Sequence, residues 1–290
     1  MTQTTHAAVV PSTPSQIWTI SKYEFKNFFG SRRFYILLLI TILIGALLTV
    51  LVGYYRPDSF LKSGALTFYS NWWGRVVTFI VILSGIFFGG DAIASEFQNR
   101  TGYFLIPNPI RRSSVYVGKW IAAFTASMLV FTVFLAITIA NGLYYFPSGV
   151  PVEFLESVAF SIVYLVAVMG FTFFFSSLFK TSSYSILVTA ILLLFVFSFL
   201  EFLVSDLVKV EPWFILTYGA GIISNVMVVD PVTGKPAYPP HVVTQTFGPG
   251  GRISLTTYNV TIPEGLMILL GYFVITAVIG LILFERKDFT

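Results

Sequence analysis

Residues 34–54 read FYILLLITILIGALLTVLVGY, and none of these side chains carries a charge. A helix needs about 20 apolar residues to cross a hydrocarbon core about 30 Å thick. Five further stretches of this kind follow, at roughly 73–93, 117–142, 156–179, 184–204 and 264–284. The sequence therefore predicts an all-α polytopic membrane protein with six transmembrane helices.

The composition of the chain excludes several other classes of protein. Of its 290 residues, 56% are hydrophobic and 10% are charged, whereas about 25% of an average soluble domain is charged. The mean hydropathy of +0.84 argues against a soluble enzyme, a disordered protein and a nucleic-acid binder. The chain contains no cysteine, which excludes disulfides, cysteine metal sites and thiol catalysis.

The distribution of lysine and arginine predicts the orientation of the spans. The N-terminal segment, the second and fourth connections and the C-terminus hold eleven of these residues, and the opposite loops hold six. Because the basic side of a membrane protein faces the cytoplasm, we expect both termini to be cytoplasmic and the protein to lie in the plasma membrane. Residues 1–14, rich in Thr, Ser and Pro, are expected to form a mobile cytoplasmic tail rather than a signal peptide.

Residues 15–31, SQIWTISKYEFKNFFGS, predict an amphipathic helix before the first span. One helical face holds Ile17, Trp18, Ser21, Phe25, Phe28 and Phe29, and the other holds Ser15, Thr19, Lys22 and Lys26. Such a helix lies in the headgroup layer, with its aromatic rings towards the acyl chains. The pattern fits an interfacial anchor and a functional contact equally well.

The segment 91–119 is the one long connection on the predicted cytoplasmic side. A solvated basic loop that sets the topology would account for its arginines. The apolar run Tyr103–Ile106 favours contact with a partner or with the membrane surface.

The connection 205–263 lies on the predicted outer side and is long for a loop. Its apolar first part, with small residues, fits a pair of short helices that dip back into the membrane. The remainder is rich in Pro, Gly, Thr and Val, and Ile253–Val260 has β-propensity. Asn259 begins an N-glycosylation sequon on this side.

No combination of residues for catalysis, metal binding or nucleotide binding falls in the spans. The two histidines, His6 and His241, lie outside them, so Ser84 has no base to activate it. Three acidic residues fall near span ends, namely Asp91, Glu156 and Glu201. Because their side chains can reach water there, anchoring at the interface explains them better than a role in an ion path. The sequence predicts no catalytic residues, no metal site and no cofactor in this chain.

Several short motifs occur in register with the six spans. The first is Tyr23-Glu24-Phe25-Lys26 followed by Ser31-Arg32-Arg33-Phe34-Tyr35. The connection after the second span holds Ser95-Glu96, Thr101-Gly102, Pro109-Ile110-Arg111-Arg112 and Gly118-Lys119. The chain ends in Phe284-Glu285-Arg286-Lys287-Asp288. With these motifs the chain resembles the membrane subunit of ABC exporters of the type-2 permease family, which have the type V exporter fold. The chain departs from the family pattern in two ways. Thr101 precedes Gly102, whereas the family usually has Gly and then Thr, and the outer loop is longer than in minimal members of the family.

The resemblance implies a permease that pairs with a second permease subunit, identical or different, and with two copies of an ABC ATPase subunit. ATP and Mg²⁺ would bind to those ATPase subunits. The segment 91–119 would form the coupling segment, and 15–31 the elbow helix beside it, leaving 32–290 as the six-helix domain. The implied ATPase-coupling residues are Glu96, Thr101, Gly102, Tyr103, Phe104, Pro109, Arg111, Arg112 and Lys119. The implied elbow-helix residues are Trp18, Lys22, Phe25 and Lys26.

The family also lines its path with the second and fifth spans. The few polar groups there are Thr78, Ser84, Thr189 and Ser198. A path so apolar suits a lipidic or amphipathic substrate better than a bare ion. An alternative from the residues alone is a stand-alone channel or receptor-like protein that binds ligand through the outer loop. We expect the chain to contact the lipid bilayer and not to bind nucleic acid.

Overall fold

The computed structural model describes residues 12–61, 64–99, 110–230, 235–247 and 253–287. Within these residues six helices are long and apolar enough to cross a membrane, which confirms the predicted all-α fold with six spans. In chain order they are α2 (Arg32–Tyr55), the segment Ala65–Gln98, α6 (Arg112–Tyr145), α7 (Val152–Leu178), the segment Ser182–Val208 and α12 (Ile262–Arg286).

Two of the spans are composite. The second consists of α4 (Ala65–Ser84), the π-helical segment η1 (Gly85–Gly89), a turn, and α5 (Ala94–Gln98). The fifth consists of α8 (Ser182–Ile191), η3 (Leu192–Val196), α9 (Phe197–Phe202) and η4 (Leu203–Val208). Short π-helical turns inside α-helices are frequent at functional sites, and here they occur in the two spans that the family resemblance assigns to the path.

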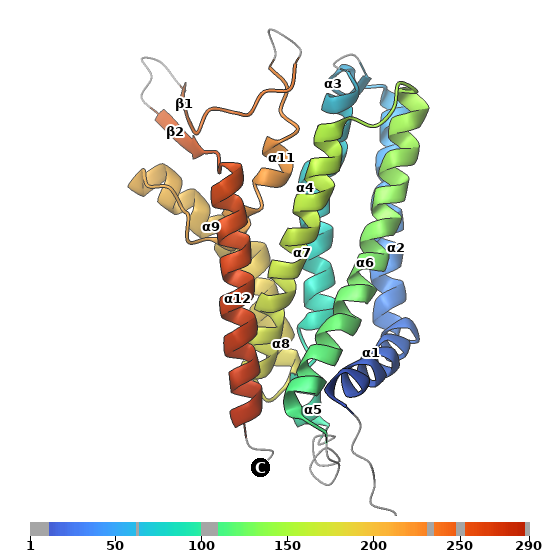
Figure 1. Cartoon of the computed structure of the whole chain (residues 1–290). Coiled ribbons are helices and arrows are strands. Elements are labelled where there is room, and N and C mark those ends of the chain that lie inside the picture. Colours follow the sequence, from blue (N-terminus) through green and yellow to red (C-terminus); the bar gives the residue numbers. More distant parts are fainter. Residues whose placement is uncertain (1–11, 62–63, 100–109, 231–234, 248–252, 288–290) are drawn as a thin grey trace, which may run out of the picture.

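The two ends of the bundle carry different structures (Figure 1). At one end lie α1 (Thr13–Phe29), α5 and the last turn of α12, and we call this the terminal end because the described chain begins and finishes there. At the opposite end, the loop end, lie α3 (Asp58–Leu61), α11 (Ile222–Asn225), β1 (Val242–Phe247) and β2 (Ile253–Tyr258). All the long helices run between these two ends.

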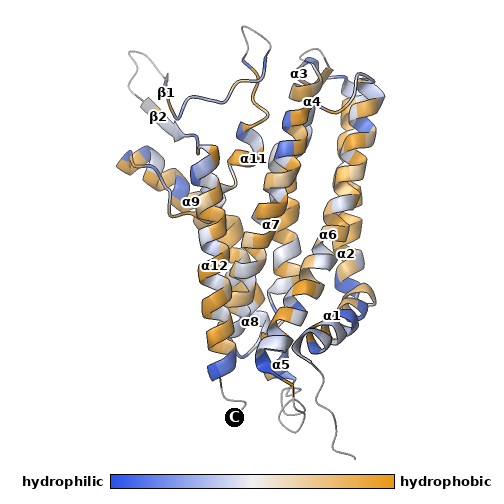
Figure 2. Cartoon of the chain, viewed as in Figure 1, coloured by the Kyte–Doolittle hydropathy of each residue, from blue (hydrophilic) through white to orange (hydrophobic). Residues whose placement is uncertain are grey.

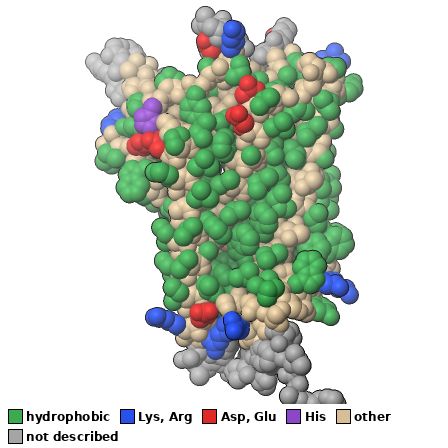
Figure 3. Space-filling model, in the orientation of Figure 1, with side chains coloured by type: hydrophobic (Ala, Val, Ile, Leu, Met, Phe, Trp, Pro, Cys, Tyr) green, Lys and Arg blue, Asp and Glu red, His purple; other side chains and the backbone are tan. Residues whose placement is uncertain are grey.

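The surface between the two ends is apolar (Figures 2 and 3). The charged side chains visible in Figure 3 lie mainly towards the two ends. On α2 and α12 large hydrophobic side chains such as Leu47, Met267 and Ile275 are more than half exposed. A surface of this kind is stable in contact with lipid, so the distribution supports a membrane-spanning bundle.

Aromatic packing around α4 forms the core. Trp72 and Trp73 are fully buried, and the Trp73 ring stacks on Phe134 of α6 with 5.5 Å between centroids and 15° between planes. The edge of Phe154 from α7 lies against the same indole, at 5.3 Å. The apolar pattern predicts that the second span begins near residue 73, whereas α4 begins at Ala65. Its first two turns contain polar residues such as Asn71 and are nevertheless helical, because their aromatic side chains pack in the core.

The loop end is folded onto the bundle. The helices α10 (Leu216–Gly219) and α11 are short, and the Ser157 hydroxyl of α7 donates a hydrogen bond to the Ile223 carbonyl (2.6 Å). Beyond them β1 and β2 pair antiparallel, with Val242 opposite Tyr258. The β-propensity of Ile253–Val260 is therefore confirmed by β2.

Candidate functional site at the terminal end

A buried lysine joins three elements at the terminal end. Lys119, in the second turn of α6, is 6% exposed. Its ammonium lies 2.6 Å from Glu24 Oε1 of α1 and 2.7 Å from Glu96 Oε1 of α5. A buried charge is tolerated when it is paired and hydrogen-bonded, and here two carboxylates from separate elements meet one ammonium. We call Glu24, Glu96 and Lys119 the terminal triad.

The helix α1 packs closely on the start of α6. Gly118 permits this approach, because a Cβ at that position would lie 2.8 Å from the Ile20 side chain. The Ser21 hydroxyl donates a hydrogen bond to the Gly118 carbonyl (3.0 Å), and the Gln16 side-chain oxygen accepts one from the Arg111 backbone N–H (3.2 Å). These contacts hold the elbow helix to α6 at several points besides the triad.

The turn that leads into α5 is held by three other spans. The Ser176 hydroxyl oxygen of α7 accepts hydrogen bonds from the backbone N–H groups of Ile93 (2.9 Å) and Ala94 (3.0 Å). The Ser185 hydroxyl of α8 donates to the Gly90 carbonyl. Asp91 forms an ion pair with Arg33 at the start of α2. Because α5 begins from this turn, its position is set by α2, α7 and α8.

The end of α12 is tied to the same region. The Lys287 ammonium donates to the carbonyls of Ser177 (2.8 Å) and Phe179 (2.8 Å) at the end of α7, and lies 4.4 Å above the centre of the Phe97 ring of α5. One guanidinium nitrogen of Arg112 donates to the Lys287 carbonyl (2.9 Å). The last carbonyls of a helix have no partner within it, so Lys287 supplies hydrogen bonds to the end of α7.

The terminal end is rich in positive charge (Figure 3). The described lysines and arginines there are Lys22, Lys26, Arg32, Arg33, Arg111, Arg112, Lys119, Lys180, Arg286 and Lys287. Apart from the buried Lys119, they form with α1 and α5 a basic surface of the kind that binds acidic partner surfaces or anionic headgroups. Among the described residues, the one group of side chains that could hold a metal lies instead at the loop end.

The predicted coupling residues fall into two groups. Glu96 and Lys119 meet in the terminal triad, and Arg111 and Arg112 stand at the start of α6, where they contact α1 and the end of α12. Thr101, Gly102, Tyr103, Phe104 and Pro109 lie outside the described residues. The last described residue before this gap follows α5 and the first one after it precedes α6.

The predicted elbow residues lie on different sides of α1. Lys22 and Lys26 are exposed, and Trp18 is 72% exposed. Phe25 is half-buried and packs against the core. The predicted face of α1 is therefore divided: its buried strip, which includes Gln16 and Ser21, contacts α6, while Trp18 is free to contact lipid or a partner.

The predicted path residues are divided between the second and fifth spans. Thr78 and Ser84 lie on α4, the most buried span, and the Ser84 hydroxyl donates to the Ile80 carbonyl of its own helix (2.8 Å). Thr189 is buried and its hydroxyl donates to the Ser185 carbonyl (2.7 Å). Ser198 is exposed on the outside of the fifth span.

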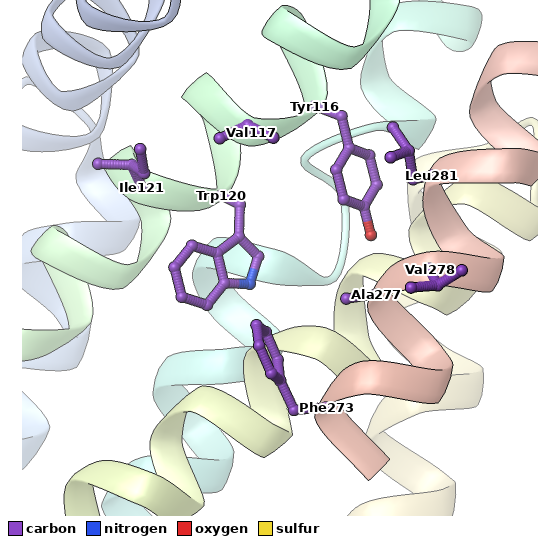
Figure 4. Close-up of a pocket in the computed structure, with 8 residues that line it drawn as sticks. All are labelled: Tyr116, Val117, Trp120, Ile121, Phe273, Ala277, Val278 and Leu281. Atoms are coloured by element: carbon purple, nitrogen blue, oxygen red, sulfur yellow. The ribbon is translucent and has the colours of Figure 1, made fainter. Parts of the chain in front are cut away.

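An apolar groove of about 380 Å³ opens between α6 and α12 near the terminal end (Figure 4). Trp120 and Tyr116 project into it from α6 and Phe273 from α12, and the rings of Trp120 and Phe273 lie 5.6 Å apart. The indole N–H and the phenol O–H are buried without a hydrogen-bond partner among the described residues. The size and lining of the groove suit an acyl chain.

The sequence did not single out Glu24, Ser176 or Lys287 as site residues. Glu24 is the one acidic residue in a basic amphipathic segment, and Lys119 is a lysine on an apolar helix. A lysine is almost never buried unless it is paired, so the sequence signalled that Lys119 had a partner. The sequence did not indicate which carboxylate pairs with Lys119, because Glu24 is 95 residues away.

Comparison with known proteins agrees with this architecture. Residues 18–289 match the family described as ABC-2 family transporter protein. No curated protein matches the chain.

Proposed function

The chain belongs to the ABC-2 family of transporter proteins, and from this membership we propose that it is a permease subunit driven by two separate ATPase subunits. ATP and Mg²⁺ bind to those ATPase subunits. The energy of hydrolysis reaches the permease through the terminal end, and substrate leaves on the side of the loop end. The observation that carries this proposal is the terminal triad.

The orientation of the proposed complex follows from charge. Lysine and arginine favour the cytoplasmic side of a membrane, and they concentrate at the terminal end. Both termini, α1 and the segment between α5 and α6 are therefore cytoplasmic in this proposal. An ATPase subunit in the cytoplasm meets these elements and not the loop end.

The terminal triad joins the proposed docking elements to a long helix. The ATPase contacts α1 and the segment 91–119. Both are tied through Lys119 to α6, which runs 34 residues across the bundle. Separating a buried ion pair costs several kcal/mol, so α1, α5 and the start of α6 move as one body. A shift of the docking surface when the ATPases close therefore tilts α6.

The fifth span is the proposed contact between two permease chains. It packs little against its own chain, and it exposes Tyr184, Leu187, Ile191 and Phe195 along its length. A second copy covers this face and forms the translocation path with it, beside Ser198. The apolar character of this face and of the groove between α6 and α12 supports a lipidic or amphipathic substrate.

The test is to purify the chain from native membranes and identify what binds its terminal end. We expect an ABC ATPase subunit to co-purify. Glu96→Gln and Lys119→Met should reduce the effect of the permease on the ATP turnover of that subunit while the permease still inserts in the membrane. Glu285→Gln is the matched control, because Glu285 is an exposed carboxylate at the same end. The proposal is wrong if no ATPase is recovered, or if both triad variants couple normally.

A further inference from the structure

Three side chains with metal-binding atoms converge at the loop end. Glu211 comes from the connection between η4 and α10, His241 precedes β1, and Glu264 lies in the first turn of α12. Each offers one ligand atom, and the three atoms lie within 4.8 Å of one another. Figure 3 shows a histidine against acidic side chains at this end of the molecule.

One pair of these atoms has the spacing found in a tetrahedral metal site. His241 Nε2 lies 3.3 Å from Glu211 Oε2. Two ligands bound to Zn²⁺ at their usual lengths of about 2.0–2.1 Å stand about 3.4 Å apart. The histidine and the first carboxylate already have this separation, and the Glu264 ligand atom lies within 4.8 Å of both. We propose that Glu211, His241 and Glu264 bind a divalent cation of the zinc type, with water as the fourth ligand.

The hydrogen bond on the other side of the imidazole ring points to a cation. His241 Nδ1 lies 3.0 Å from the Asn259 carbonyl oxygen, which can only accept, so Nδ1 carries a proton. In the neutral ring Nε2 then directs its lone pair at the Glu211 carboxylate. Two electron-rich groups at this distance repel each other unless a cation lies between them. The competing arrangement is a doubly protonated ring paired with Glu211, and the experiment below separates the two.

Each candidate ligand is also oriented by a group that is not itself a ligand. The Tyr218 hydroxyl donates to Glu211 Oε1 (2.6 Å). The Thr261 backbone N–H and hydroxyl donate to Glu264 Oε2 (3.0 and 2.7 Å). A carboxylate has about four lone-pair sites, so each glutamate keeps some for a cation. Metal-ligating histidines and carboxylates are held in this way by outer hydrogen bonds to carbonyls and hydroxyls.

A cation at this position joins three parts of the loop end. It ties the start of β1 and the connection before α10 to the first turn of α12, in the region where Asn259 Nδ2 donates to the Pro240 carbonyl (2.7 Å). Nitrogen and carboxylate oxygen together suit Zn²⁺ better than Mg²⁺ or Ca²⁺, which take oxygen ligands. The inference does not depend on the permease role, because it rests on the loop end alone.

The test measures metal bound to the full chain. The protein is purified in detergent with an affinity tag that contains no histidine, treated with a chelator, and equilibrated with Zn²⁺ or Co²⁺. We expect about one Zn²⁺ per chain by elemental analysis, a tetrahedral Co²⁺ absorption spectrum, and no comparable binding of Mg²⁺. His6→Ala is the matched control and should bind as the wild type, since His6 is the other histidine of the chain.

Three variants separate a metal site from an ion pair. Glu264→Gln removes a metal ligand but keeps the capping box of α12, because glutamine can replace glutamate in that motif. The variant should therefore fold and should not bind Zn²⁺ stoichiometrically. His241→Lys keeps a positive charge beside the carboxylates and should also abolish stoichiometric binding. Tyr218→Phe, which alters only the outer hydrogen bond, should weaken binding by about 10- to 100-fold. The proposal is overturned if the wild type binds no Zn²⁺ at micromolar concentration, or if His241→Lys or Glu264→Gln binds as the wild type does.

Discussion

At the scale of single residues, Lys119 is the side chain on which the terminal end depends most. It is the buried member of the terminal triad, and its partners come from α1 and α5. Lys119→Met keeps the length and the apolar stem of the side chain but leaves two carboxylates without their cation. We expect the free energy of unfolding to fall by about 3–5 kcal/mol, the usual cost of removing one member of a buried ion pair.

Chemical unfolding in detergent, followed by tryptophan fluorescence, measures this loss. Lys26→Met is the control, because Lys26 is exposed on the same end and an exposed substitution changes stability by about 0.5 kcal/mol or less. A triple variant that also carries Glu24→Gln and Glu96→Gln should recover much of the loss, since no charged carboxylate then remains beside the substituted methionine. Equal stability of Lys119→Met and Lys26→Met would contradict the structure.

Lys287 gives a second prediction at this scale. It lies just beyond α12, and burial together with the neighbouring Lys180 lowers the pKa of its ammonium to about 8. In the unfolded chain a lysine has a pKa of about 10.4. Because the unfolded chain binds this proton more tightly, the folded state is penalised below about pH 8, and the penalty disappears as the pH rises towards 10.

The pH dependence of acylation at Lys287, measured by mass spectrometry of peptides, tests this. The neutral amine is the reactive form, so the rate in the folded protein should reach half its maximum near pH 8. In a denatured sample the midpoint should move to about pH 10. The same midpoint in both samples would show that Lys287 is not buried as described.

At the scale of elements, the sequence predicts the long helices well and their ends less well. The run 34–54 carries no charge, so the position of the first span is well defined by the sequence. The helix α2 includes the whole of this run. The third span starts at Arg112 rather than near 117. Its first turn contains Arg112 and Ser114, polar residues at which a hydropathy pattern ends the span, and Ser114 is buried here.

The π-helical segment η1 could not be predicted from the apolar pattern, but the need for glycine at its end has a visible cause. A Cβ on Gly89 would lie 2.1 Å from the Thr172 side-chain oxygen of α7. Small residues allow helices in membranes to approach closely. The chain therefore needs glycine where the second span meets α7, just before the turn into α5.

Gly89→Ala tests this contact. The added methyl group forces η1 and α7 apart, and overpacking of this kind costs about 1–3 kcal/mol. Gly271→Ala is the matched control, because a Cβ there meets nothing within 4 Å and alanine is favoured over glycine in a helix by about 1 kcal/mol. Thermal unfolding should place Gly89→Ala below the wild type and Gly271→Ala at or above it. The reverse order would show that the two helices are not in contact as described.

At the scale of the whole molecule, the family and the number of spans follow from the sequence, whereas the arrangement of the coupling residues does not. The motifs around Glu96 and Arg111 mark the family, but only the fold brings Glu24 to Lys119 across 95 residues. The contacts at the loop end could not be predicted from the sequence either. Glu211, His241 and Glu264 are scattered along the sequence and meet only when α10, β1 and α12 are assembled.

The orientation of the molecule gives a prediction that the composition makes simple to test. The chain has no cysteine, so a single introduced cysteine is the only thiol. In intact cells an impermeant maleimide should label Lys235→Cys at the loop end and leave Lys26→Cys at the terminal end unlabelled until the membrane is opened. Labelling of Lys26→Cys in intact cells would invert the proposed topology.

The proposed role of the terminal end in coupling is tested most directly by photo-crosslinking in native membranes. A photoreactive amino acid in place of Asn99, which is exposed where the chain leaves α5, should form an adduct that mass spectrometry identifies as an ABC ATPase subunit. The same amino acid in place of Tyr238, exposed at the loop end, should form no such adduct. An ATPase adduct at Tyr238 and none at Asn99 would contradict the account.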